Sequence, residues 1–178
     1  MGGSPTIGSV FAQRIVVGVG DMAVSNNTNM IISTYALGSC VGVVVYDPFV
    51  SVGGILHVML PDSTLSPDKA AMQPSMFADT GWRVFWQSLV SLRAEKRRVK
   101  VVIAGGASVL SQSDMFKIGE RNAAAIKRIL QEEGIPTFAE ELGGLNNRTL
   151  HLQLKTGTVE IKYPTGTKQL ELKEPHES

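Results

Sequence analysis

Residues 41–60 read VGVVVYDPFVSVGGILHVML, two runs of strand-forming residues around a turn. Val41–Tyr46 and Gly54–Leu60 are rich in β-branched and apolar side chains, which predicts a strand for each run. The loop 47–52 opens with Asp-Pro and is followed by Gly-Gly, and both dipeptides are typical of turns. We therefore expect an antiparallel hairpin closed across this loop.

Further strands are expected before and after this hairpin, at 14–19, 30–35, 99–104, 149–154 and 159–163. Apolar side chains at three- and four-residue spacing from Trp82 to Leu92 predict one helix. Residues 118–133 predict a second, which stops at Gly134. The pattern favours an α/β fold in which a mixed, mostly antiparallel sheet packs with two main helices.

The length of 178 residues favours a single domain over 1–178, with 1–13 as an N-terminal arm and 171–178 as a polar tail. Seventeen basic against sixteen acidic residues leave a net charge of +1, which argues against a nucleic-acid binder. The apolar runs are far shorter than the roughly 20 residues of a membrane-spanning helix. The single cysteine, Cys40, excludes an internal disulfide and a four-cysteine zinc site. Without a targeting signal at the N-terminus, we expect a cytoplasmic protein.

Three side chains are brought to one face by this pattern of hairpins. In the hairpin across 47–52, His57 lies opposite Gly42, and Cys40 is its diagonal neighbour about 7–8 Å away. If 30–34 pairs with 40–44 in a second hairpin, Thr34 lies opposite Cys40. A one-residue slip in either register would separate the three side chains.

These residue types suit thiol catalysis. A thiol attacks as thiolate, and its ordinary pKa of about 8.5 leaves only a few per cent ionised at neutral pH. An adjacent His57 imidazolium would lower that pKa and later protonate a leaving amine, while Thr34 would accept a hydrogen bond from the far ring nitrogen. The backbone N–H groups of Ser39 and Cys40 are candidate oxyanion donors. The alternative is structural: a small buried thiol, a core histidine and an ordinary strand threonine.

At these residues the sequence resembles the CheD family of chemoreceptor glutamine deamidases. The resemblance rests on motifs in the family's order from about residue 14 to 173, namely TYALGSCV at 34–41, GILHVMLP at 54–61, FAD at 77–79, IAGGAS at 103–108, IGERN at 118–122 and LGG at 142–144 with Arg148.

The resemblance implies a three-layered α/β sandwich and a triad of Cys40, His57 and Thr34. It implies hydrolysis of receptor glutamine carboxamides to glutamate through a thioester, with release of ammonia and without a cofactor or metal. The implied partners are the helical cytoplasmic region of methyl-accepting chemotaxis receptors and the phosphatase CheC. From charge and run length we expect no nucleic-acid partner and no membrane insertion. Two alternatives stay open: a non-catalytic adaptor that binds receptors and CheC, and an esterase acting on receptor methyl esters.

Four weaker signals accompany these. Gly105–Ala107 lacks the residues of a phosphate loop and is expected to form a tight turn near the active site. The proline-bracketed stretch 61–74 is expected to be a mobile loop. Basic residues at 93–100 predict a solvated helix end, or else a surface for acidic receptor helices. An apolar lip at the site is a further hypothesis, formed by Val58, Met59, Leu60 and Phe77.

Overall fold

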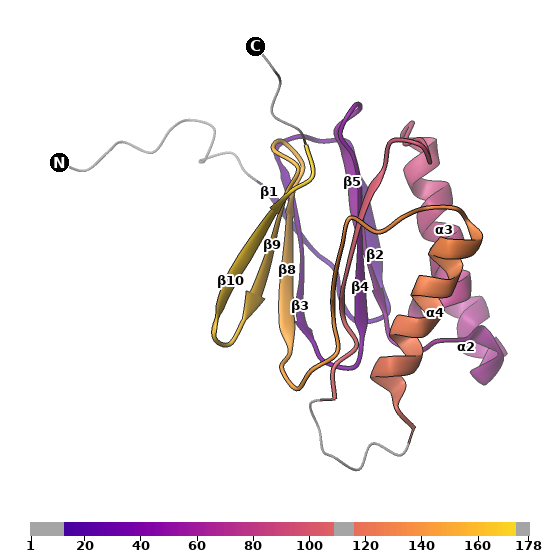
Figure 1. Cartoon of the computed structure of the whole chain (residues 1–178). Coiled ribbons are helices and arrows are strands. Elements are labelled where there is room, and N and C mark those ends of the chain that lie inside the picture. The colour runs from indigo at the N-terminus through magenta and orange to yellow at the C-terminus, as the bar shows by residue number, and fades with distance from the viewer. Residues whose placement is uncertain (1–12, 109–115, 174–178) are drawn as a thin grey trace.

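The computed structural model describes residues 13–108 and 116–173. Its elements form three layers: two stacked sheets and a layer of helices on the outer face of the second sheet (Figure 1). The first sheet has the strand order β1-β3-β8-β9-β10, and the second has the order β2-β5-β4-β6-β7. In chain order the elements are β1 (Gln13–Val16), β2 (Met22–Ser25), β3 (Met30–Leu37), β4 (Val41–Asp47), β5 (Val52–Val58), η1 (Ser63–Leu65), α2 (Pro67–Met72), η2 (Pro74–Met76), α3 (Ala78–Ser91), β6 (Lys100–Gly105), α4 (Ile118–Glu132), β7 (Ala139–Leu142), β8 (Arg148–Gln153), β9 (Thr158–Tyr163) and β10 (Gly166–Glu171).

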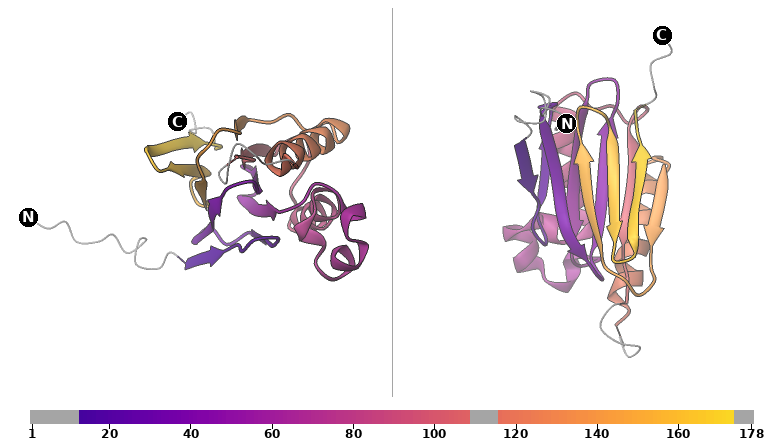
Figure 2. Two further views of the ribbon diagram at one scale, coloured as in Figure 1. Left: turned by 90° about the horizontal axis from the view of Figure 1, so that it is seen from below. Right: turned by 90° about the vertical axis from the view of Figure 1, so that its left-hand side faces the viewer.

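The α/β class and the three-layered sandwich are confirmed, with antiparallel pairs outnumbering parallel ones. The pattern of strands had suggested one sheet, whereas the structure has two of five strands each. The view along the layers shows how the first sheet covers the face of the second that the helices leave open (Figure 2).

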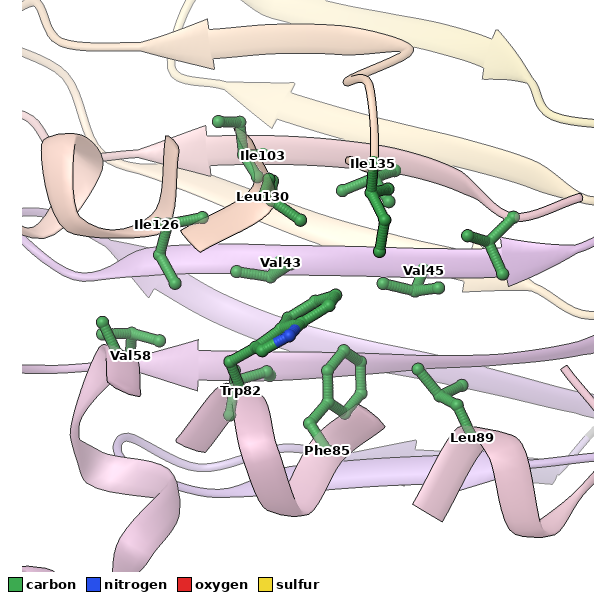
Figure 3. Packing of buried hydrophobic residues seen from close by; sticks show 14 of the residues in the cluster. Val43, Val45, Val58, Trp82, Phe85, Leu89, Ile103, Ile126, Leu130 and Ile135 are labelled. Atoms are coloured by element: carbon green, nitrogen blue, oxygen red, sulfur yellow. The ribbon is translucent and has the colours of Figure 1, made fainter. Parts of the chain in front are cut away.

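Strand β4 is buried on both faces, which explains its nearly continuous apolar sequence. Its odd-numbered valines, such as Val43 and Val45, face the helices and pack with Trp82 and Phe85 of α3 (Figure 3). Its even-numbered Val44 belongs to the core between the two sheets. The strand therefore joins two hydrophobic cores, and any side chain on its even face lies between the sheets.

The predicted β4–β5 register is confirmed, and Gly42 pairs with His57. The predicted hairpin between β3 and β4 is wrong, since β3 pairs with β1 and β8 in the other sheet. The ladder of β3 with β8 is irregular between Thr34 and Leu37, and Ala36 has a φ of 56°. The chain leaves the first sheet after this bend and enters the second at β4.

Several boundaries differ from those expected. Helix α3 starts four residues earlier than Trp82, and β5 spans Val52–Val58 rather than 54–60. Short elements without strong periodicity were missed, namely β2, β7 and β10. The stretch 61–74, expected as a mobile loop, contains η1 and α2.

The ends of the chain also extend the sheets beyond the expected bounds. Gln13 and Glu171, assigned above to the arm and the tail, belong to β1 and β10. The rest of that arm, and the tail from residue 174 onward, lie outside the described residues. Among the helices described, none is long and apolar enough to cross a membrane.

Candidate active site

Thr34 and His57 meet between the two sheets, Thr34 from β3 and His57 from β5. Both side chains are buried, and Thr34 Oγ1 lies 2.7 Å from His57 Nδ1. The Thr34 hydroxyl also donates to the carbonyl of Val17 at 2.8 Å. The predicted contact between the two residues is therefore present, although packing of the sheets produces it rather than the hairpin expected from the sequence.

These two contacts determine where the ring proton of His57 lies. A threonine hydroxyl has one proton, and a carbonyl oxygen can only accept. Because that proton is given to Val17, Thr34 must accept from His57, so Nδ1 carries the hydrogen. In the neutral ring, Nε2 then holds a lone pair. Nε2 is buried and has no hydrogen-bond partner among the residues that the structure describes.

The segment 17–21 fixes the backbone of His57. The His57 N–H donates to the carbonyl of Asp21 at 2.9 Å, and the Gly20 N–H donates to the carbonyl of His57 at 3.0 Å. The carbonyl of Gly20 in turn accepts from Gln73 Nε2 and Ser75 Oγ, each at 2.7 Å. Residues from two other parts of the chain, 20–21 and 73–75, thus hold the backbone of His57 in one place.

Cys40 immediately precedes β4 and lies on the same side of the second sheet as His57. It is half-buried and packs against the core between the sheets. Gly42 is its neighbour on that face, where a Cβ would come within 2.7 Å of Leu150 and 2.9 Å of Leu37. A side chain at position 42 would therefore overfill the space between the sheets beside the thiol and the ring.

The electrostatics of the free protein differ from the expected ion pair. Burial raises the pKa of the Cys40 thiol, an effect that its own backbone N–H partly offsets. Burial lowers the pKa of His57 to about 4. At neutral pH the two groups are therefore a thiol and a neutral imidazole, and the ring can act as a proton acceptor rather than as a resting cation.

The turn before Cys40 is held through its carbonyl groups. The carbonyls of Gly38 and Cys40 accept from the N–H groups of Ala107 at 2.8 Å and Gly106 at 2.9 Å. The carbonyl of Ser39 accepts from the side chain of Asn122 at 3.0 Å. Within the described residues, the N–H groups of Ser39 and Cys40 donate no backbone–backbone hydrogen bond, and the N–H of Cys40 lies near its own thiol. Both stay predicted oxyanion donors.

The weaker expectations have mixed outcomes. The turn at Gly105–Ala107 does lie beside the candidate site, and the contacts just described occupy two of its N–H groups.

The basic cluster at 93–100 is largely ion-paired, with Arg98 on buried Asp47, Arg97 on Glu95 and Lys96 on Glu133. The apolar lip is reduced, because Val58 and Phe77 are fully buried and only Met59 of that set is clearly exposed. The part of the chain that is described contains no cluster able to hold a metal ion.

Sequence reasoning missed several residues of this region. The carbonyl of Val17 has no sequence signal, since every residue has one. Gln73 lies in the stretch 61–74 expected as a mobile loop, and Ser75 directly follows it. Asn122 belongs to the IGERN motif, and the sequence alone indicates no role for it. It is fully buried near the start of a helix, where an unpaired amide would be costly.

Comparison with known proteins gives a consistent result. The family model for CheD chemotactic sensory transduction matches residues 59–163. A probable chemoreceptor glutamine deamidase CheD 1 of Syntrophus aciditrophicus is 44% identical over 152 residues, which cover 85% of this chain and 95% of the relative. The chemoreceptor glutamine deamidase CheD of Thermotoga maritima is 40% identical over 159 residues, covering 89% and 98%. A solved Neisseria meningitidis protein, NMB0706, aligns with 76% of this chain and 64% of its own at 9% identity, and its TM-score of 0.42 is too low to bear on fold or function.

Proposed function

The chain belongs to the CheD family, and we propose that it is a chemoreceptor glutamine deamidase in which Cys40 is the nucleophile, His57 the base and acid, and Thr34 the residue that orients His57. The names of its relatives support the activity. The observation that carries the mechanism is the Thr34–His57 contact, which leaves Nε2 of the ring with a lone pair.

The first half of the reaction forms a thioester. As Cys40 Sγ attacks the carboxamide carbon of a glutamine, His57 Nε2 takes the thiol proton. The negative charge that develops on the carboxamide oxygen is stabilised by the N–H groups of Ser39 and Cys40. When the carbon–nitrogen bond breaks, His57 gives the proton to the leaving nitrogen, and ammonia departs.

The second half hydrolyses the thioester. Water attacks the thioester carbon while His57 Nε2 takes one of its protons. The carbon–sulfur bond then breaks, the proton returns to Sγ, and the receptor side chain leaves as glutamate. Throughout both halves Thr34 holds the Nδ1–H, so the ring presents Nε2 to the reacting atoms.

Burial of both groups favours proton transfer during attack over a preformed ion pair. The raised pKa of Cys40 and the lowered pKa of His57 both oppose charge separation in the free protein. When a substrate carboxamide is bound, the negative charge moves from sulfur to the carboxamide oxygen as the carbon–sulfur bond forms. The thiol is therefore activated mainly when the substrate is bound, which protects it from reaction with other electrophiles.

The proposed setting is the cytoplasm, where the helical cytoplasmic region of chemoreceptors is the substrate. CheC is a proposed further partner, as the resemblance of the sequence implies. Met59, 39% exposed and two residues after His57, is the candidate contact for a receptor helix next to the site.

The experiment is mass spectrometry of a receptor cytoplasmic fragment incubated with the wild type and with Cys40→Ala, together with an ammonia assay. We expect conversion of specific glutamines to glutamate by the wild type and none by Cys40→Ala, with the fold of the variant checked by circular dichroism. Equal conversion by the variant would overturn the proposal. Release of methanol from a methylated fragment without release of ammonia would instead indicate an esterase. Binding to the fragment without any turnover would indicate an adaptor.

A further inference from the structure

Asn122 joins the two segments that carry Cys40 and His57. Its side chain is fully buried near the start of α4, and Nδ2 donates to the carbonyl of Ser39 at 3.0 Å and to the carbonyl of Met59 at 2.9 Å. An amide nitrogen has two protons, so both are used. One bond ends on the residue before Cys40 and the other on the second residue after His57.

The bond to Ser39 determines the direction of a backbone N–H. The described part of the chain has no cis peptide bond, and in a trans peptide the C=O and N–H point in opposite directions. Because the Ser39 carbonyl points at Asn122, the N–H of Cys40 points away from α4. The Ala107 N–H, by holding the Gly38 carbonyl, directs the N–H of Ser39 in the same way. The two candidate oxyanion donors are therefore aimed by groups behind the turn.

Close packing places Asn122 at the distance that this requires. Gly119, one turn earlier in α4, lies against Gly106 and Ala107, where a Cβ would come within 2.6 Å of the Ala107 carbonyl. The start of the helix is thus in contact with the same residues that hold the carbonyls of Gly38 and Cys40. A bulkier residue at 119 would push Asn122 away from Ser39.

The chemistry of the side chain argues that packing alone is not its purpose. Asn122 Oδ1 is buried and has no hydrogen-bond partner within the described residues. An unpaired buried acceptor destabilises a fold, whereas leucine would fill a similar volume without that acceptor but would remove the donor from the carbonyls of Ser39 and Met59. The asparagine thus provides two hydrogen-bond donors at this position, although its Oδ1 is left unpaired among the described residues.

We propose that Asn122 is a positioning residue that aims the N–H of Cys40 at the oxyanion, an assignment that rests on the proposed deamidation. It does not contact the substrate. It acts through the Ser39–Cys40 peptide and, by holding Met59, keeps that peptide in register with the segment that follows His57.

The test compares Asn122→Leu with Tyr46→Phe. Asn122→Leu removes two buried hydrogen bonds to backbone carbonyls. The control removes one, the 2.8 Å bond from Tyr46 to Leu154 at the other end of β4. We expect Asn122→Leu to lower kcat for receptor deamidation about 10²–10³-fold, as loss of an oxyanion donor does, with KM changed less than about threefold. Tyr46→Phe should keep the wild-type kcat.

Alkylation of Cys40 by iodoacetamide provides the second readout, because it requires a thiolate but no oxyanion donor. We expect its rate in Asn122→Leu to stay within about threefold of the wild type. A kcat equal to that of Tyr46→Phe would overturn the assignment, and so would a loss of alkylation in proportion to kcat. If the leucine variant does not fold, Asn122→Ala removes the same donors without added bulk and is judged by the same criteria. Failure of the deamidation proposal is distinct: the wild type itself would then release no ammonia, or Cys40→Ala would release it normally.

Discussion

Two hydroxyl–imidazole pairs lie back to back on β3. Thr34 faces the core between the sheets and contacts His57 Nδ1 at 2.7 Å, while Ser33 faces the outer side and contacts His151 Nδ1 at 2.6 Å. Both hydroxyls and both rings are buried or nearly so. By distance and residue type the two pairs are almost the same.

A third group beside each pair places the ring proton on opposite nitrogens of the two histidines. Thr34 gives its proton to the carbonyl of Val17, so it accepts from His57 Nδ1. On the outer side Arg14 donates to Ser33 at 2.6 Å and lies 2.9 Å from His151 Nδ1. A guanidinium only donates, so Nδ1 of His151 is an acceptor and the proton of the neutral ring lies on Nε2. The comparison teaches that the partner beyond the hydroxyl decides which ring nitrogen can act as a base.

The largest expected effect separates the two histidines directly. His57→Gln should lower kcat for receptor deamidation about a thousandfold or more, because it removes the group that takes the thiol proton. His151→Gln should leave kcat within about twofold of the wild type. Both are measured by ammonia release at saturating receptor fragment, and comparable losses in the two variants would contradict the distinction.

The next effect separates the two hydroxyls. Thr34→Val removes the acceptor that holds the Nδ1–H, so the His57 ring loses its fixed tautomer, and kcat should fall about a hundredfold. Thr34→Ser should recover most of the activity, since it restores a hydroxyl between Val17 and the ring. Ser33→Ala is the matched control and should leave kcat unchanged. A Thr34→Val enzyme with normal kcat would show that the contact is structural only.

The smallest effect is on stability as a function of pH. The pKa of His57 is about 4 in the folded protein, against about 6.5 unfolded, so the unfolded chain binds the extra proton between these values. The stabilisation of the folded state is complete above about pH 6.5 and is lost as the pH falls toward 4. Between pH 7.5 and pH 5 the wild type should lose about 2 kcal/mol more than His57→Gln, a factor of about 30 in the folding equilibrium.

Urea denaturation of both proteins at the two pH values measures this difference. His151, whose pKa is also lowered by burial and then by Arg14 and Lys162, is present in both proteins and cancels from the comparison. Equal losses in the two proteins would show that His57 is protonated as easily in the folded state as in the unfolded chain.

The sequence predicts the pairing of β4 with β5 but not the pairing of β3, and the reason is physical. The β4–β5 register was predictable because a short loop joins the strands and fixes every pair. The partner of β3 was not, because β8 lies more than a hundred residues away and the bend at Ala36 has no strong sequence signal. Thr34 was therefore placed beside His57 through a wrong pairing that happened to leave it on the correct face.

The supporting groups were beyond sequence reasoning for a different reason. Val17 acts through a backbone carbonyl, which carries no residue identity. Asn122 acts across a distance of 83 residues to Ser39, and only the packing of α4 on the turn at Gly106 reveals it. Cys40 and His57 are proposed as nucleophile and base from their types and spacing, whereas the groups that hold the ring proton and the Cys40 turn became visible only in the structure.

The division of the proposed triad between two sheets would make the proposed activity depend on completed folding. Thr34 belongs to a strand held by β8, whereas Cys40 immediately precedes β4 and His57 lies in β5, and these two strands form a hairpin from the first third of the chain. A nascent or proteolysed chain without β8 would have the thiol and the imidazole but no support for the strand that orients the ring. We expect such fragments to deamidate bystander proteins far more slowly than the folded protein, so the proposed chemistry depends on the pairing of β3 with β8.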